Sequence, residues 1–95
     1  MLTGKQKSYL RSEAHHLQPI FQIGKGGLTD PIIKQVEEAL EARELIKVSI
    51  LQNCEEDKHE IAAKFEDAGI HVVQIIGKIL VLYKESKEKK RIELP

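Results

Sequence analysis

The sequence is poor in aromatic and thiol side chains: its 95 residues include no tryptophan, two phenylalanines, two tyrosines and one cysteine. The lone cysteine, Cys54, excludes an internal disulfide and favours a reducing cytoplasm as the location of the protein. Because aromatic rings are few, the hydrophobic core has to be built mainly from isoleucine, leucine and valine.

Long hydrophobic runs are also missing from the sequence. No apolar stretch approaches the roughly 20 residues that a transmembrane helix needs, and Met1 to Lys7 form no apolar signal region. Apolar residues make up 41% of the chain and charged residues 32%, which suits one domain with a single core. We therefore expect a monomeric cytoplasmic protein without membrane contact.

The net charge is zero, because 15 lysines and arginines balance 15 aspartates and glutamates, but the charges are segregated along the chain. Residues 1–36 carry a net charge of +3, residues 37–69 one of −6 and residues 70–95 one of +3. A folded domain could gather these charges into a basic face and an acidic face, and the basic face would attract a polyanion. Ordinary solvated surfaces are an equally good interpretation of the composition alone.

Hydrophobic periodicity predicts seven elements in the order helix, strand, helix, strand, helix, strand, strand. They cover residues 3–16, 20–23, 30–43, 45–51, from Glu56 or Asp57 to Gly69, 70–76 and 79–83. The first two strands, joined by a helix, should be parallel, and the last two, joined only by Gly77-Lys78, should form an antiparallel hairpin. The expected fold class is α/β, more specifically α+β in two layers: a mixed four-stranded sheet with helices packed on it.

The glutamates of the second helix, the acidic residues before the third helix and the charged C-terminal run are interpreted structurally. We expect a water-facing side of the second helix at Glu37, Glu38 and Glu41, and a cap with favourable dipole charge for the third helix at Glu55, Glu56 and Asp57. The run from Lys84 to Arg91 has five basic residues, two acidic residues and no apolar residue, so it predicts either a helical extension or a flexible tail. The chain then divides into a domain over residues 1–84 and a charged extension over residues 85–95.

A glycine-rich loop, Gly24-Lys25-Gly26-Gly27, lies between a predicted strand and the helix start at Thr29-Asp30-Pro31. Glycine permits close backbone approach, and a helix N-terminus favours an anion through its free N–H groups and dipole. Lys25 adds a full charge, so the chemistry fits a phosphate. The nucleotide patterns GxxxxGK[ST] and GxGxxG are absent, whereas a GxxG loop that clamps a nucleic-acid backbone is typical of KH domains. A tight structural turn is the alternative for the loop alone, but the lysine, the helix start and the basic flank favour nucleic acid.

Basic residues on the first helix extend this prediction. Lys7, Arg11 and His15 share a helical spacing and, together with Lys25 and Lys34, could make a continuous phosphate track, although each alone fits a solvated side chain. The complete set of predicted contact residues is Gly24, Lys25, Gly26, Gly27, Thr29, Lys34, Lys7, Arg11, His15 and Lys78. With so few aromatic residues, base stacking should not dominate, so binding should follow backbone and shape.

Catalytic and metal chemistry find little support. No set of nucleophile, base and orienting residue is visible, so we do not expect an enzyme. Cys54 with His59, or His15 with His16, has none of the spacings of a metal site, so we expect neither a metal nor another cofactor.

The acidic surface offers a function of a different class. In this alternative the protein is an interaction adaptor that docks through Glu37, Glu38 and Glu41, and nucleic-acid binding is incidental. Charge reversal at these glutamates would then matter more than charge reversal at Lys25. The two functions can also coexist on two faces of one domain.

The glycine loop and its surroundings resemble the CRM domain, named for chloroplast RNA splicing and ribosome maturation. The loop signature is Gln22-Ile23-Gly24-Lys25-Gly26-Gly27-Leu28-Thr29. The resemblance covers roughly residues 2–84 in the family's order. It includes Leu10-Arg11, residues 14–19 at the exit of the first helix, residues 44–48 in the second strand and residues 72–83 in the closing hairpin.

This resemblance implies RNA binding through the GxxG loop and nearby basic surface. It also implies a fold like that of the C-terminal domain of the third bacterial translation initiation factor. Single-domain members of this size are similar to the bacterial YhbY type, which is associated with precursors of the large ribosomal subunit. The expected partner is therefore RNA, in particular large-subunit ribosomal RNA or its precursor particle, with contact to a ribosomal protein as an additional expectation.

Overall fold

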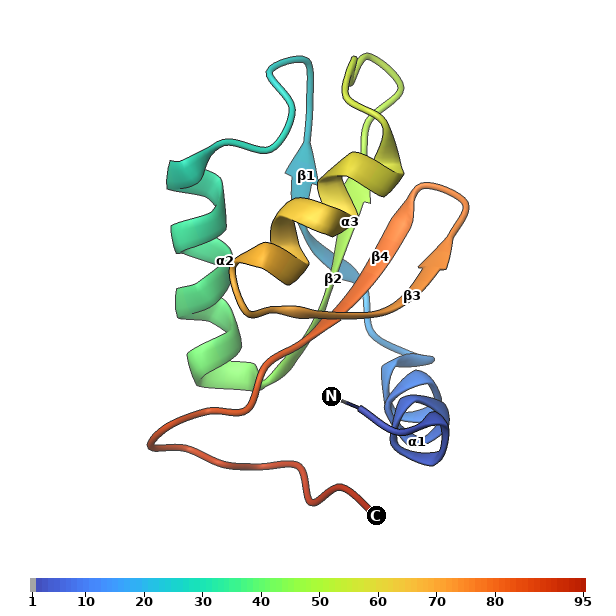
Figure 1. The fold of residues 1–95 in the computed structure, drawn as a ribbon, viewed down its shortest axis with the longest axis vertical. Helices are drawn as coiled ribbons and strands as arrows, with labels where there is room; N and C mark the ends of the chain where they lie inside the picture. Colours follow the sequence, from blue (N-terminus) through green and yellow to red (C-terminus); the bar gives the residue numbers. More distant parts are fainter. Residues whose placement is uncertain (1) are drawn as a thin grey trace.

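Four strands form one mixed sheet in the order β1-β2-β4-β3, and three helices pack on it (Figure 1). The computed structural model of the protein describes residues 2–95. The elements are α1 (Gly4–Ala14), β1 (Pro19–Ile23), α2 (Asp30–Arg43), β2 (Leu45–Ile50), α3 (Lys58–Asp67), β3 (His71–Ile76) and β4 (Ile79–Tyr83). The predicted fold class and the order of elements are confirmed, with helix ends that differ by a few residues.

Two of the three strand pairings follow the prediction, whereas the pairing of β2 with β4 was not predicted. β1 and β2 are parallel, because α2 crosses between them, while β4 is antiparallel to both β2 and β3. Gly77 supplies the turn between β3 and β4 with a positive φ of 57°, a conformation that glycine adopts without steric cost. The parallel pair brings the C-terminal ends of β1 and β2 to one edge of the sheet, which is where the glycine loop begins.

The helices lie on both faces of the sheet, because β2 and β4 carry apolar side chains on both faces. One alternating set, including Ile46, Val48 and Leu82, packs in a core cluster with α2 and α3. The other set, Leu45, Val81 and Tyr83, packs with Leu10 and Ala14 of α1. The expected two-layer packing therefore describes the sheet with α2 and α3, and α1 adds partial cover on the opposite face.

The ends of the helices are set by local side-chain bonds. Thr3 caps α1 in a reciprocal capping box with Gln6, and the Asp57 carboxylate caps α3 by accepting the backbone N–H of His59 at 2.9 Å. Gly69 follows α3 with a φ of 85°, as predicted for a glycine after a helix end. None of the helices in residues 2–95 is long and apolar enough to cross a membrane.

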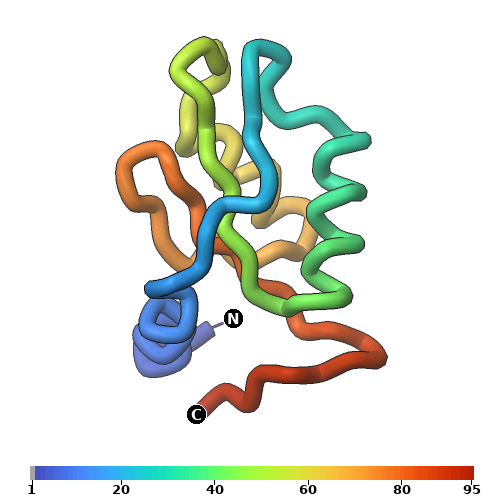
Figure 2. Tube along the Cα trace, turned by 180° about the vertical axis from the view of Figure 1, so that it is seen from behind, coloured from blue at the N-terminus to red at the C-terminus, as the bar shows by residue number. Residues whose placement is uncertain are grey.

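The C-terminal extension is neither a helix nor a free tail, which corrects both expectations for this segment. After β4 the chain runs in irregular conformation from the C-terminal end of α2 across to α1 (Figures 1 and 2). Ile92 and Leu94 pack against the α1 cluster, and the Gln6 side chain donates a hydrogen bond to the Pro95 carbonyl at 3.2 Å. The prediction failed because the run up to Arg91 has no apolar residue, and the two that anchor it come just after.

Candidate nucleic-acid interface

Three connections gather around one end of the sheet: the glycine loop after β1, the loop of residues 51–57 after β2, and the β3–β4 turn (Figure 1). The Leu51 backbone N–H donates to the Ile23 carbonyl at 2.9 Å, and the Ile50 N–H donates to the Lys78 carbonyl at 2.7 Å. The Lys58 ammonium donates to the Gly77 carbonyl at 3.0 Å. These bonds connect the three segments, so they form one end of the molecule, here called the loop end.

The glycine loop makes a tight turn with an exposed tip. The Gly27 N–H donates to the Gly24 carbonyl at 2.9 Å, which leaves Lys25 and Gly26 exposed between them. Gly27 is buried and has a φ of 69°, in the left-handed region that favours glycine. A Cβ atom at Gly27 would also stand 2.6 Å from Oε1 of Glu56, so this position needs glycine for two separate reasons.

Glu56 braces the loop, and this corrects its predicted role as a cap for α3. Its carboxylate accepts the Leu28 backbone N–H at 2.8 Å and pairs with the Lys64 ammonium at 2.5 Å. Lys64 also donates to the Leu28 carbonyl at 3.2 Å, so the two side chains hold both polar groups of one residue. The Lys64 bond and the Leu28 N–H lower the pKa of Glu56 below its ordinary value, against a smaller opposing effect of burial.

The start of α2 faces the same end of the molecule. Thr29 is the N-cap, but its side chain makes no capping hydrogen bond, and Pro31 lies in the first helical turn as predicted. The first helical bond in this turn runs from the Ile33 N–H to the Thr29 carbonyl at 3.0 Å. Asp30 adds a negative charge here, which opposes an anion at this helix start, whereas Lys25 places an exposed positive charge on the neighbouring loop.

The structure brings some of the predicted contact residues together and separates others. Lys25, Thr29 and Lys78 lie at the loop end and are exposed. Lys34 lies further along α2, in a groove that it shares with glutamates of α2 and of the extension. The loop end therefore holds the glycines and two of the predicted lysines.

The α1 stripe of Lys7, Arg11 and His15 lies at the opposite end of the molecule from the glycine loop in both views (Figures 1 and 2). This corrects the expected continuous track from α1 to Lys25. The reason is that Leu10 and Ala14 pack with Val81 and Tyr83, on the sheet face that α2 and α3 do not cover. A ligand that touches both ends has to span much of the 37 Å long dimension.

Sequence reasoning missed several charged residues with defined positions. Lys47 lies in β2 on the α1 face of the sheet, which the alternation Leu45-x-Lys47-x-Ser49 could have indicated. Lys58 and Lys64 support the loop end, but the carbonyl groups that they bond lie 19 and 36 positions away, and Glu56, the other partner of Lys64, lies outside α3, so no local helix pattern reveals them. Glu44, described below, was missed for the same reason.

The acidic surface is partly used by the chain itself. Glu37 pairs with Lys84 at 3.4 Å, and Glu41 accepts hydrogen bonds from the extension, at 2.8 Å from the Ser86 hydroxyl and 2.9 Å from the Lys87 N–H. Glu38 is exposed. Glu37 and Glu41 therefore remain accessible to water, as predicted, but both are half-buried and also bond residues of the segment after β4. Within residues 2–95, no group of three or more histidine, cysteine, aspartate or glutamate side chains could hold a metal ion.

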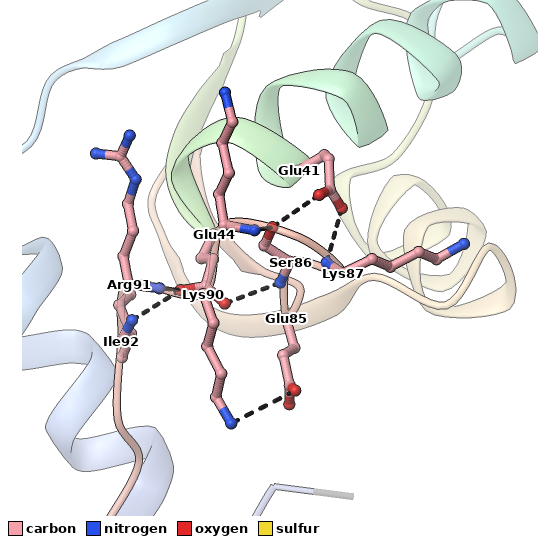
Figure 3. A network of polar contacts seen from close by, with 9 residues as sticks. Glu41, Glu44, Glu85, Ser86, Lys87, Lys90, Arg91 and Ile92 are labelled. Atoms are coloured by element: carbon pink, nitrogen blue, oxygen red, sulfur yellow. Dashed lines mark hydrogen bonds and ion pairs between the residues drawn. The ribbon is translucent and has the colours of Figure 1, made fainter.

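Glu44 also holds the extension, at the end of the molecule opposite the loop end. Glu44 ends α2 with a φ of 65°, and its side chain is fully buried. Its carboxylate accepts backbone N–H groups of Ser86 at 2.8 Å, Ile92 at 2.7 Å and Arg91 (Figure 3). Burial raises the pKa of Glu44, but these N–H groups outweigh that effect and hold the pKa below its ordinary value.

Comparison with known proteins gives consistent matches over the whole chain. The family model described as the CRS1/YhbY (CRM) domain matches residues 2–84, which confirms the predicted resemblance. The Bacillus subtilis protein named "Probable RNA-binding protein YqeI" is 68% identical, with 100% of both chains covered. A Haemophilus influenzae protein named "RNA-binding protein" is 43% identical over 99% of this chain and 95% of its own. The solution structure of SAV1595 from Staphylococcus aureus has a TM-score of 0.82 and 58% identity, with both chains fully covered.

Proposed function

The chain belongs to the CRS1/YhbY (CRM) domain family, and we propose that it is an RNA-binding protein that holds the RNA phosphate backbone with its Gly24–Gly27 loop. We further propose that its RNA is that of the large ribosomal subunit or its precursor particle, and that it acts in the assembly of this subunit. The names of two similar proteins, from Bacillus subtilis and Haemophilus influenzae, support RNA as the ligand class. Cytoplasmic location, a monomeric state and contact with a ribosomal protein belong to the same proposal.

The observation that carries the proposal is the construction of the loop. Lys25 and Gly26 project into solvent, while Gly27 and Leu28 behind them are buried and held by Glu56 and Lys64. A loop that is already rigid loses little conformational entropy when it binds, so its single lysine can act as a positioned phosphate contact. The glycine at the tip lets a sugar-phosphate backbone approach the main chain closely.

The other basic residues have graded roles in this proposal. Lys78 lies at the loop end and extends the contact beyond Lys25. Lys7, Arg11 and His15 on α1 contact a different part of the RNA, because they lie at the opposite end of the molecule. Phosphate contacts of this kind fix orientation and affinity without reading sequence, so target choice depends on RNA shape.

Charge reversal at the loop tip tests the phosphate contact. We expect Lys25→Glu to weaken binding to a large-subunit ribosomal RNA fragment and to lower the salt slope of log affinity by about one unit, because one phosphate contact is lost. The melting temperature should stay unchanged, since Lys25 is exposed. Arg43→Glu, which changes the net charge equally at an exposed position of α2 outside the proposed contacts, is the control and should retain the wild-type slope.

The same proteins test the identity of the RNA in cells. After ultraviolet crosslinking and sequencing of the bound RNA, the wild-type protein should be enriched on large-subunit precursor RNA, and Lys25→Glu should lose this enrichment. Normal binding by Lys25→Glu would contradict the phosphate clamp. Crosslinks without enrichment on that precursor would contradict the assembly role and leave general RNA binding.

A further inference from the structure

A hollow of about 510 Å³ lies between α1 and the C-terminal extension, far from the glycine loop. Its lining consists of Tyr9 from α1 and Lys90, Arg91 and Glu93 from the extension. One aromatic and two basic residues in the lining match what single-stranded RNA needs, because the ring can stack on a base while the cations contact phosphates. Neither the loop nor the α1 stripe of the proposed function uses this hollow.

Tyr9 is unusual among the few aromatic residues of this chain because its ring is accessible. It is 37% exposed, whereas Tyr83, the other tyrosine, is 3% exposed and packs in the α1 cluster. Gln6, one turn before Tyr9, donates its hydrogen bond to Pro95, so this flank of α1 faces the extension. Lys7 and Arg11 lie on the other flank by helical spacing, which separates the hollow from the basic stripe.

The two basic side chains of the lining extend from the extension in opposite directions (Figure 3). The backbone N–H groups of Arg91 and Ile92 both donate to Glu44, so the Arg91 guanidinium can point away from that carboxylate, as the close-up shows. The Lys90 ammonium lies 3.6 Å from the Glu85 carboxylate, an exposed pair that a stronger anion can replace. Glu93 opposes a phosphate, but the two cations outnumber it in the lining.

We propose that this hollow is a second RNA contact, in which single-stranded RNA stacks one base on Tyr9 and places separate phosphates on Lys90 and Arg91. The inference rests on the proposed function only for its ligand class, RNA. Glu44 acts as a positioning residue, because it holds the main chain from which Arg91 projects. The loop end then holds the backbone of structured RNA, while the hollow holds an unpaired nucleotide at the opposite end.

Binding of a short labelled oligouridylate to the full-length protein tests the proposal. We expect Tyr9→Ala to weaken this binding roughly tenfold, the loss typical for one stacked base, and Arg91→Glu to weaken it further. Tyr9→Phe keeps a flat ring and should retain affinity. Because the chain has no tryptophan, tyrosine is its fluorophore, so oligouridylate should quench the wild-type emission and quench that of Tyr9→Phe much less. Glu44→Gln should weaken binding of oligouridylate without changing the tyrosine emission of the unbound protein.

The two proposals can fail separately. If Tyr9→Ala and Arg91→Glu bind oligouridylate as the wild type does, or if the wild type shows no quenching, the hollow is not an RNA contact, whatever Lys25→Glu does to structured RNA. If instead these two variants no longer bind oligouridylate while Lys25→Glu binds structured RNA normally, the result supports the hollow as an RNA contact and contradicts the phosphate clamp at the loop. Tyr9 and Arg91 are exposed, so unchanged melting temperatures for their variants check that the protein is folded.

Discussion

The two ends of the molecule are each held by a glutamate that accepts backbone N–H groups, but the two glutamates are used differently. At the loop end, Glu56 accepts one N–H, from Leu28, and shares its charge with Lys64. At the extension end, Glu44 is fully buried and accepts three N–H groups of the extension. One carboxylate thus braces a short turn, and the other fastens a long segment.

The difference lies in what each carboxylate leaves free. Glu56 holds the residues behind the loop tip, so Lys25 projects from a rigid base. Glu44 holds the main chain of the extension, so its basic side chains project from a segment that has no secondary structure of its own. A carboxylate that accepts several backbone N–H groups can order an irregular segment, as the hydrogen bonds between strands order a strand in a sheet. Irregular segments at both ends can therefore present charges in fixed positions.

The largest effect on stability is expected from a substitution that disrupts the loop end. Gly27→Ala should lower the free energy of unfolding by about 2 kcal/mol or more, because a left-handed conformation disfavours any side chain and the new Cβ meets the Glu56 carboxylate. Urea denaturation measures this change. Gly26→Ala is the matched control: its Cβ meets no atom within 4 Å, so its effect should stay within about 0.5 kcal/mol. Equal effects of the two substitutions would show that the brace does not constrain the loop.

The next largest effect on stability is expected from a substitution that releases the extension. Glu44→Gln should lower the free energy of unfolding by about 2 kcal/mol, because neutral oxygen is a weaker acceptor for the three N–H groups and the new amide hydrogens are buried. Hydrogen exchange of the Arg91 and Ile92 amides should accelerate more than that of the core strands. Glu41→Gln, in a more accessible carboxylate that also contacts the extension, should have a smaller effect on both quantities. Unchanged exchange at Arg91 and Ile92 in Glu44→Gln would contradict the fastening role.

Much of the fold could be predicted from the sequence, because its strands and turns are encoded locally. The helix between β1 and β2 and the Gly77-Lys78 link between β3 and β4 predict two of the three strand pairings from local sequence, but not the pairing of β2 with β4. The position of α1 could not be predicted, because a narrow stripe of Leu10 and Ala14 fits either face of a sheet. The path of the extension depends on carboxylates more than 40 residues away, which no local pattern contains.

The candidate site could also be predicted only in part from the sequence. Lys25 and the glycines were found because the loop lies between a strand and a helix in the sequence itself. The track from Lys7 to Lys25 was wrong because it assumed that two basic segments share a face. Glu56 was assigned to the nearest helix start, whereas it bonds a backbone group 28 residues away. A buried glutamate with positive φ, such as Glu44, has no sequence signal, since glycine is the expected residue there.

Acid titration gives the smallest effect and compares the two carboxylates directly. In the folded protein, the pKa of Glu56 is lowered mainly by the bond from Lys64, and the pKa of Glu44 is lowered by N–H groups that outweigh its burial; the ordinary value is 4.5 for both. A lowered pKa in the folded state means that the stabilisation is present above pH 4.5 and is lost as the pH falls through the folded pKa. The amide proton shifts of Leu28 and Arg91 should therefore titrate with midpoints below 4.5, and Glu56→Gln and Glu44→Gln should each abolish only the titration at its own end. A midpoint at or above 4.5 for Arg91 would mean that burial outweighs the N–H groups and that Glu44 fastens the extension less tightly than Glu56 braces the loop.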